Sequence, residues 1–192
     1  MNVAFLKETS RGLERFTAAD ELLKHRKVFF TEEVTPESSN ELIQYLLCLE
    51  QQDEKTPVTV YINSPGGEVV SGLAAYDTMR TLKCQVNTVC IGTAASMGSI
   101  LFLAGEKRAM LPHTKIMIHD PLISGLSGSR KALELEKEAK QLLETREITG
   151  RIIAERSGHK LREVYAKTKE DCFLTAEEAL DFGIATEIVD RL

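Results

Sequence analysis

This chain of 192 residues lacks the features that mark several classes of function. It has no excess of positive charge, because 24 Lys and Arg stand against 29 Asp and Glu and the net charge is −5. That balance argues against a nucleic-acid-binding protein, which needs cationic side chains along the phosphates. No Gly-x-x-x-x-Gly-Lys loop and no metal-ligand spacing is present, so neither ATP nor a bound metal is indicated. So short a chain also cannot hold both an ATP-driven motor and a separate catalytic domain.

Signals for secretion are also missing. Residues 1–11 include Lys7, Glu8 and Arg11 and contain no apolar core of signal-peptide length. The four cysteines form no Cys-x-x-Cys pair and lie among apolar or strand-like neighbours. Such cysteines are typical of small buried hydrophobic residues in a reducing compartment. We therefore expect a cytoplasmic protein.

One uncharged run, residues 86–105, has the length of a membrane span, about 20 residues. It contains too many small polar residues for a helix that faces lipid, among them Asn87, Ser96 and Ser99. A buried strand, a tight turn and a buried helix would produce the same run. We therefore expect no membrane association.

The composition, with 43% hydrophobic and 28% charged residues, is that of an ordinary globular protein, and the length predicts one domain. Strand and helix patterns alternate along the chain, which predicts an α/β fold with a largely parallel sheet. We expect strands at residues 27–31, 57–62, 86–91, 108–111, 115–119, 171–174 and 184–189, and helices at 17–25, 36–50, 68–82 and 95–104. Thr35 and Thr175 are expected to cap the helices that follow them.

Residues 130–156 are predicted to form one long charged helix with few apolar positions. A Gly- and Ser-rich loop at residues 121–129 precedes it. A helix of that length in so small a domain is expected to protrude, and its apolar stripe needs another subunit to bury it.

The strongest local candidate for chemistry runs from Gly92 to Gly98, between a predicted strand and a predicted helix. A serine among small residues at such a turn presents its hydroxyl to a substrate, and the first amides of the next helix face developing negative charge. The segment differs from the Gly-x-Ser-x-Gly elbow of α/β-hydrolases, because Gly92 stands four residues before Ser96. The same residues also suit a helix start chosen for close packing, and local chemistry leaves both interpretations open.

A second candidate is the loop at residues 62–67, Ile-Asn-Ser-Pro-Gly-Gly, at the end of another predicted strand. Consecutive glycines expose backbone N–H groups, which suits an oxyanion hole or an anion-binding nest. A plain strand-to-helix turn explains the loop equally well. The two loops lie close together if their strands are neighbours in one parallel sheet.

Further candidates lie at the ends of two later strands. His119 closes the strand at residues 115–119 and is a candidate general base, although a lone histidine is usually structural or solvated. Asp120 is a poor partner for His119, since successive strand side chains point to opposite faces. Asp171 opens a strand, where an Asp is most often a turn or cap residue.

Five motifs in a fixed order carry a resemblance to a known family. They are Tyr61-Ile-Asn-Ser-Pro-Gly-Gly67, Tyr76-Asp-Thr-Met79, Gly92-Thr-Ala-Ala-Ser-Met-Gly98, Met117-Ile-His119-Asp-Pro121 and Asp171-Cys-Phe-Leu-Thr-Ala-Glu-Glu178. Together they resemble ClpP, the family of proteolytic subunits of the ATP-dependent Clp protease (peptidase family S14). The resemblance covers nearly the whole chain, from about Glu8 to Val189.

The resemblance implies the ClpP/crotonase fold, with stacked βαβ units and a protruding handle helix. Residues 1–192 would form one ClpP-like peptidase domain. Within it, residues 1–16 would be the N-terminal axial segment and residues 122–157 the handle region.

The resemblance also implies a serine-type ATP-dependent endopeptidase that acts through an acyl-enzyme. Ser96 would be the nucleophile, His119 the general base and Asp171 the residue that orients the histidine. The backbone N–H groups of Gly67 and Met97 would form the oxyanion hole. The subunit would need no cofactor, since the partner unfoldase uses the ATP.

The partners that the resemblance implies are other subunits and an unfoldase. Two stacked heptameric rings, a tetradecamer, would enclose the active sites. An AAA+ unfoldase such as ClpX, ClpA or ClpC would deliver unfolded polypeptides for protein quality control. A second ClpP paralogue is a further candidate partner.

The chain departs from the family pattern at several positions. Glu170 stands where the family often has an Arg that contributes to contacts between rings, and Asp120 stands where Gln is common. Ile123-Ser124 replaces a Gly-Gly pair at the strand edge that would bind the substrate peptide. Thr59 and Thr81 occupy positions where aromatics are expected in the pocket for the unfoldase.

Two other functions remain as alternatives. The departures fit a weakly active or assembly-partner ring subunit that works with a second ClpP. A crotonase-type acyl-CoA enzyme would share the fold and an oxyanion hole, but it would not need the combination of Ser96, His119 and Asp171.

Overall fold

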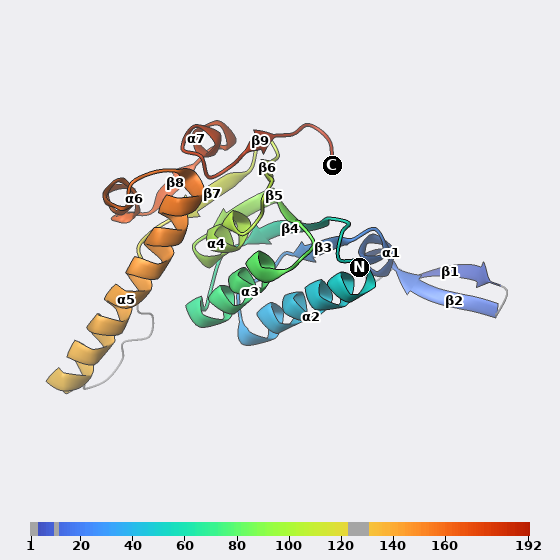
Figure 1. Ribbon diagram of the computed structural model, residues 1–192, viewed down its shortest axis with the longest axis horizontal. Helices are drawn as coiled ribbons and strands as arrows, with labels where there is room; N and C mark the ends of the chain where they lie inside the picture. The colour runs from blue at the N-terminus through green and yellow to red at the C-terminus, as the bar shows by residue number, and fades with distance from the viewer. Residues whose placement is uncertain (1–3, 10–11, 123–130) are drawn as a thin grey trace.

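The computed structural model describes residues 4–9, 12–122 and 131–192, and its centre is a seven-stranded sheet covered by helices (Figure 1). The strands of this sheet are β3 Lys27–Phe30, β4 Val58–Ser64, β5 Val86–Ala95, β6 Arg108–Met110, β7 Lys115–Ile118, β8 Cys172–Leu174 and β9 Glu187–Ile188. The helices are α1 Ala18–Lys24, α2 Pro36–Gln52, α3 Val69–Thr81, α4 Met97–Leu103, α5 Ala132–Ser157, α6 Leu161–Thr168 and α7 Ala176–Asp181. Strands β1 Ala4–Thr9 and β2 Gly12–Thr17 form a separate antiparallel hairpin.

The sheet is largely parallel, as the alternating pattern predicts. Strands β3, β4, β5, β6 and β9 are parallel neighbours in that order, and β7 is parallel to β5. Strand β8 is antiparallel to β7. The predicted fold class, α/β with a largely parallel sheet, is therefore confirmed.

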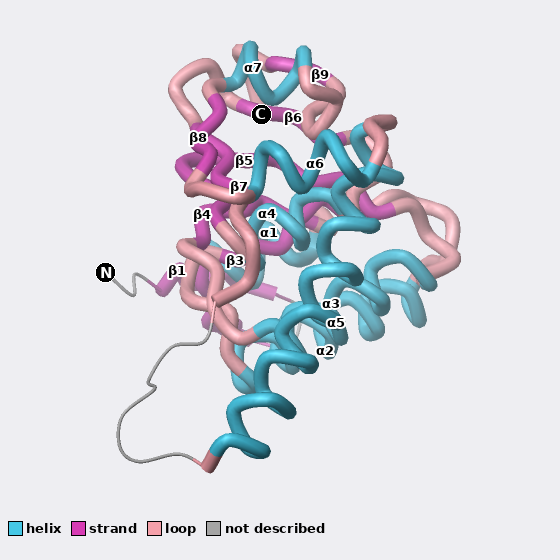
Figure 2. Tube along the Cα trace, turned by 90° about the vertical axis from the view of Figure 1, so that its left-hand side faces the viewer, coloured by secondary structure: helices cyan, strands magenta, loops and turns pink. Residues whose placement is uncertain are grey.

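The sheet separates two apolar regions of unequal size. Alternate residues of β4, namely Val58, Val60 and Ile62, are buried in the main core beneath the helices. Tyr61 points to the other face and belongs to a small cluster with Val89 and Ala109. Side views show α2 and α3 beside the strands on one side (Figure 2). Each large side chain buried in this way contributes roughly 1.5–3 kcal/mol to the free energy of unfolding.

Helix starts follow the predicted capping residues. The Thr35 side chain accepts a hydrogen bond from the Ser38 amide, and Pro36 occupies the first turn of α2. The Thr175 side chain accepts from the Glu178 amide at the start of α7, which completes the predicted capping box.

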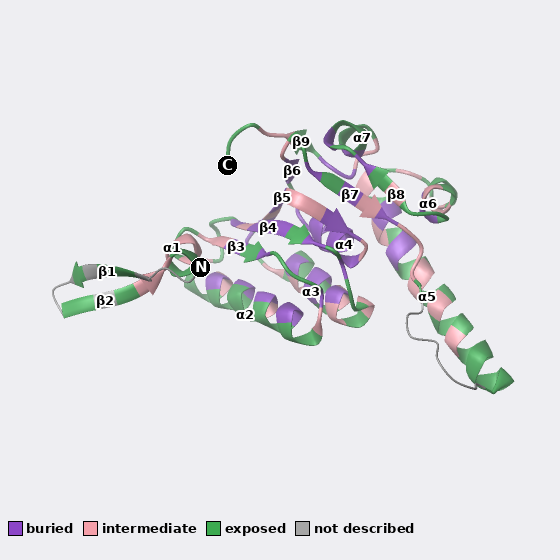
Figure 3. Ribbon diagram, turned by 180° about the vertical axis from the view of Figure 1, so that it is seen from behind, coloured by how far each residue is buried: buried purple, intermediate pink, exposed green. Residues whose placement is uncertain are grey.

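The long helix α5 protrudes from the body, as predicted (Figure 1). Its buried residues are Thr149, Gly150, Ile153 and Ala154, all in its C-terminal half. The other end is exposed (Figure 3), and there Leu133 and Leu143 are 78% and 63% exposed. The body of this chain therefore leaves the apolar side chains at the protruding end of α5 uncovered.

Four features differ from the predictions. Helix α6 and the hairpin of β1 and β2 were not expected. Strand β5 continues through Ala95 and pairs with β7 from Thr93 onward, whereas the prediction placed a turn there. Cys48 is exposed, because it lies on the outer face of α2, so the prediction of buried cysteines is wrong for that residue. Cys84 and Cys90 are buried, as expected.

The uncharged run at residues 86–105 forms β5 and α4 within the core. Across the described ranges, no helix combines the length and the apolar character that crossing a bilayer requires. Ile123-Ser124, the substituted Gly-Gly position, lies outside the residues that the structure describes.

Candidate active site

Ser96 lies at the junction between the end of β5 and the start of α4. Its backbone has φ 51° and ψ −122°, a conformation that costs free energy for any residue with a side chain. The Ser96 amide donates a hydrogen bond of 2.9 Å to the Met117 carbonyl in β7, which fixes the junction against the strand that ends beside His119. The predicted turn is thus a single strained residue that holds its hydroxyl at the carboxyl edge of the sheet.

His119 and Asp171 are brought together by the pairing of β7 with β8. In this antiparallel ladder Ile118 lies opposite Cys172, so the next residues along each strand, His119 and Asp171, also face each other. His119 Nδ1 is 3.1 Å from Asp171 Oδ1, and His119 Nε2 is 2.8 Å from Ser96 Oγ. Three sequence-predicted site residues therefore form one hydrogen-bonded chain.

The members of this chain differ in their exposure to water. The His119 side chain is 14% exposed, whereas the Asp171 side chain is 63% exposed. The imidazole is held between a hydroxyl and a carboxylate with little solvent around it. Asp171 stands at the rim of the site, where water or another subunit reaches it.

The glycine loop after β4 lies directly against the Ser96 junction. A Cβ placed on Gly66 would be 2.7 Å from the Ser96 Cβ and 3.0 Å from the Met97 nitrogen, so only glycine permits this approach. Gly67 has φ +146° and is bridged to Val34, whose carbonyl accepts a hydrogen bond from the Glu68 amide. The structure therefore brings the two predicted loops together.

The amides of Gly67 and Met97 are available for an external acceptor. Within the described residues, neither amide donates a hydrogen bond to another group of the protein. The Met97 amide is also the first of α4, and unsatisfied amides at a helix start carry partial positive charge. Two such donors beside a serine hydroxyl suit an oxyanion.

A cavity of about 540 Å³ opens beside Ser96 and His119. Its apolar wall includes Val69, Met97, Ile100, Leu122 and Ile153. Thr149 and Ile153 come from α5, so the protruding helix contributes one wall near its buried end. The cavity is large enough for an apolar side chain next to the serine.

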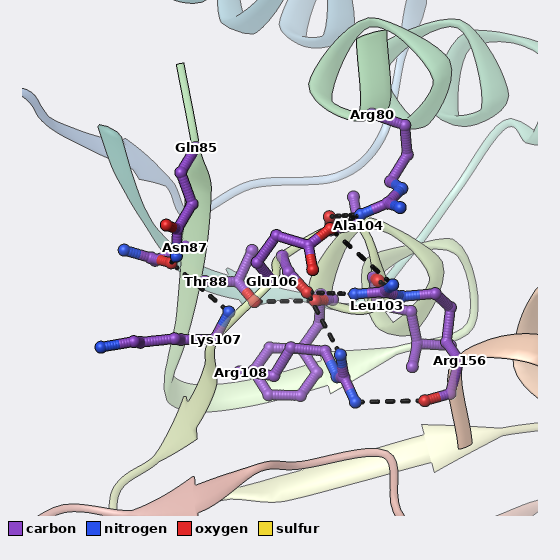
Figure 4. Close-up of polar contacts among 12 residues, drawn as sticks. Arg80, Gln85, Asn87, Thr88, Leu103, Ala104, Glu106, Lys107, Arg108 and Arg156 are labelled. Carbon is purple, nitrogen blue, oxygen red and sulfur yellow. Dashed lines mark hydrogen bonds and ion pairs between the residues drawn. The ribbon is translucent and has the colours of Figure 1, made fainter. Parts of the chain in front are cut away.

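The far end of α4 is fixed by three arginines (Figure 4). Arg108 of β6, Arg156 of α5 and Arg80 of α3 donate hydrogen bonds to main-chain oxygens around that end, those of Leu103, Ala104, Gly105, Arg156, Gly183 and Ile184. Burial lowers the pKa of Arg108 to about 10, so its guanidinium stays charged at neutral pH. Hydrogen bonds from charged donors contribute roughly 1.5–3 kcal/mol each. They hold the helix whose other end begins beside Ser96.

Asp120 turns away from the histidine, as predicted from strand geometry. Its carboxylate accepts hydrogen bonds from Arg146 and Thr168 instead. Local sequence patterns gave no sign of these two partners, which lie on α5 and α6. In the part of the chain that the structure describes, no group of three or more His, Cys, Asp or Glu is placed to hold a metal ion.

A comparison with known protein families agrees with this geometry. The family model described as Clp protease matches residues 10–192, nearly the whole chain. The matched span includes Gly67, Ser96, Met97, His119 and Asp171. The chain therefore belongs to the Clp protease family.

Proposed function

We propose that this ClpP-type protease is a serine endopeptidase that hydrolyses peptides and unfolded proteins through an acyl-enzyme. The observation that carries the proposal is the chain of hydrogen bonds from Ser96 Oγ through His119 to Asp171, at 2.8 Å and 3.1 Å. Nucleophile, base and orienting carboxylate in this order are the arrangement of a serine-protease triad.

In the first half of the reaction, Ser96 Oγ attacks the carbonyl carbon of the scissile peptide bond. His119 Nε2 takes the hydroxyl proton, and Asp171 stabilises the resulting imidazolium. The carbonyl oxygen gains negative charge and accepts hydrogen bonds from the Gly67 and Met97 amides. His119 then donates the proton to the leaving amine, the C–N bond breaks, and an ester on Ser96 remains.

In the second half, water replaces the amine. His119 removes a proton from the water as its oxygen attacks the ester carbonyl, and the same two amides stabilise the second oxyanion. The proton returns to Ser96 Oγ when the ester bond breaks, which releases the carboxylate product. The subunit uses no cofactor in this scheme.

The assembly that we propose follows from the family and from exposed apolar surface. Clp protease family members assemble as oligomers and work with AAA+ partners, and we expect two stacked heptameric rings here. The exposed Leu133, Leu143 and Ile148 of α5 favour burial against further subunits. ATP would be used by an unfoldase such as ClpX, ClpA or ClpC, and a cytoplasmic location stays a prediction.

A second candidate function is that of a ring subunit that assembles with a ClpP paralogue and contributes little activity itself. Glu170, immediately before Asp171, is exposed and places a negative charge beside the site. A partner subunit with a positive charge at the facing position would complement it, whereas a second copy would repel it. Native mass measurement of the protein with and without a paralogue separates the two assemblies.

A fluorophosphonate probe tests the proposed chemistry. The oxygen of an activated serine attacks the phosphorus, the P–F bond breaks and fluoride leaves. The serine becomes a stable phosphonate ester, which mass spectrometry of the digested protein locates. We expect labelling at Ser96 in the assembled protein and none in the His119→Ala variant, because the unassisted hydroxyl is a weak nucleophile. An assembled sample without label on Ser96 would contradict the proposal.

Replacement of Gly67 by alanine tests the oxyanion hole. The new Cβ would lie 2.2 Å from the Val34 carbonyl oxygen, so the loop and its amide must move. We expect kcat for a fluorogenic peptide to fall by roughly 10²–10³-fold, the usual effect of losing one oxyanion donor. Gly158→Ala is the matched control, since Gly158 also has positive φ but no atom within 4 Å of its Cβ position. A folded Gly67→Ala variant with unchanged kcat would contradict the oxyanion hole, and the glycine loop would then be a plain strand-to-helix turn.

A further inference from the structure

Asp120, the residue after the histidine of the triad, is bound by two elements far from it in sequence. Arg146 Nε of α5 donates to Asp120 Oδ2 at 2.6 Å. The Thr168 hydroxyl, at the end of α6, donates to Asp120 Oδ1 at 2.6 Å. The Asp120 amide also donates to the Thr168 carbonyl at 2.7 Å. Both carboxylate oxygens and the main chain of Asp120 are therefore occupied.

These contacts connect the two segments that carry the triad. Asp120 follows His119 directly, and Thr168 lies three residues before Asp171. The ladder between β7 and β8 ends at the pair Ile118 with Cys172. The Asp120–Thr168 contacts lie beyond that pair and outside its register, and they add a second connection between the same two segments. The separation between His119 and Asp171 is set from both sides, by the ladder and by this connection.

Arg146 adds the long helix to the connection. The guanidinium carbon of Arg146 lies 3.8 Å from the centroid of the Tyr165 ring, so the guanidinium packs on an aromatic side chain of α6. Its Nε binds Asp120 at the same time. The side chains of Arg146 and Asp120 are 30% and 29% exposed, and Thr168 is 3% exposed. Charge-assisted hydrogen bonds that are largely shielded from water hold geometry better than exposed pairs do.

We propose that Asp120 is a positioning residue of the active site, which fixes the distance between His119 and Asp171 by binding Thr168 and Arg146. The inference rests on the proposed serine-peptidase function. Asp120 does not touch the reacting atoms, and it acts through the placement of the imidazole and its carboxylate partner. We assign no such positioning role to Glu170 or to the exposed ion pairs of α5.

Substitution at Asp120 tests the proposal through the split between kcat and KM. We expect Asp120→Ala to lower kcat for a fluorogenic peptide by about 10²-fold, the effect of roughly 1 Å of misplacement, with KM within about threefold. Asp120→Asn keeps an oxygen for the Thr168 hydroxyl and should restore kcat to within about tenfold of the original. The double variant Asp120→Ala/Arg146→Gln should be no slower than Asp120→Ala. The contact between Arg146 and Asp120 is already lost in Asp120→Ala, so the second substitution removes nothing more from it.

Arg151→Gln is the matched control. It removes the 2.6 Å ion pair of Arg151 with Glu147, which has the same length as the ion pair of Arg146 with Asp120. Arg151 lies on α5 like Arg146, but on an exposed face. We expect its kcat within about twofold of the original protein. Equal losses in Arg151→Gln and Asp120→Ala, or no loss in Asp120→Ala, would overturn the positioning role.

A crystal structure of Asp120→Ala provides a readout that does not depend on activity. We expect the His119 Nδ1 to Asp171 Oδ1 distance to lengthen from 3.1 Å beyond hydrogen-bonding range. An unchanged distance would overturn the inference even if the protein proves inactive. Failure of the original protein to label at Ser96 would instead overturn the proposed function alone.

Discussion

Replacing Ser96 or His119 with alanine is expected to lower kcat for peptide hydrolysis by on the order of 10⁵–10⁶-fold. Ser96 Oγ and His119 Nε2 lie 2.8 Å apart. In the proposed mechanism they act as one unit, because the hydroxyl is a poor nucleophile until the imidazole accepts its proton. The double variant should therefore be no slower than either single variant. The measurement is the initial rate on a fluorogenic peptide, with the cleaved products identified by mass spectrometry.

Residual activity distinguishes the site from other sources of hydrolysis. Both variants should still hydrolyse the peptide faster than the uncatalysed reaction, since the proposed oxyanion hole of the Gly67 and Met97 amides remains in place. His25→Ala is the control, because His25 is exposed and, among the described residues, its side chain pairs only with Glu21, four positions away. If Ser96→Ala kept a kcat within tenfold of the original, another nucleophile would have to be sought.

Asp171→Asn is expected to lower kcat by on the order of 10³–10⁴-fold while KM changes little. The carboxylate accepts a hydrogen bond from the Nδ1–H of His119, which leaves Nε2 free to take the serine proton. An amide at position 171 can donate to Nδ1 and so favours the tautomer with the proton on Nε2, which cannot act as a base. The steady-state kinetics of both proteins on one peptide provide the measurement.

The neighbouring carboxylate supplies the control for this substitution. Glu170 is also exposed but has no hydrogen bond to His119 among the described contacts. Glu170→Gln should leave kcat within a few-fold of the original under conditions that keep the assembly intact. A large loss in Glu170→Gln together with an active Asp171→Asn variant would transfer the orienting role to Glu170.

Much of the fold was predictable, because its signals are local. Buried strands and capped helices repeat along the chain, and this repetition predicts a parallel sheet. The position of Ser96 was also predictable, since small residues between a strand and a helix mark a close approach. The interpretation of the glycine loop stayed open until the structure placed Gly66 against the Ser96 junction.

The contact between His119 and Asp171 was predictable only from the resemblance to ClpP. The two residues are 52 positions apart, and the pairing of β7 with β8 leaves no pattern in either strand alone. Helix α6 was missed because only Val164 and Thr168 of its eight residues are buried, which is too few for a visible period. The partners of Asp120 were missed for a similar reason, since their contacts exist only after α5 and α6 pack.

The backbone of Ser96 sets thermal stability and chemistry against each other at a single residue. Holding a side chain at φ 51° and ψ −122° costs roughly 1–3 kcal/mol, which the surrounding strand, helix and arginine contacts must offset. Glycine adopts such a conformation without the same cost. Selection for a higher melting temperature alone would therefore favour Ser96→Gly and discard the hydroxyl. In the proposed mechanism, the serine at this position serves the reaction and not the stability of the fold.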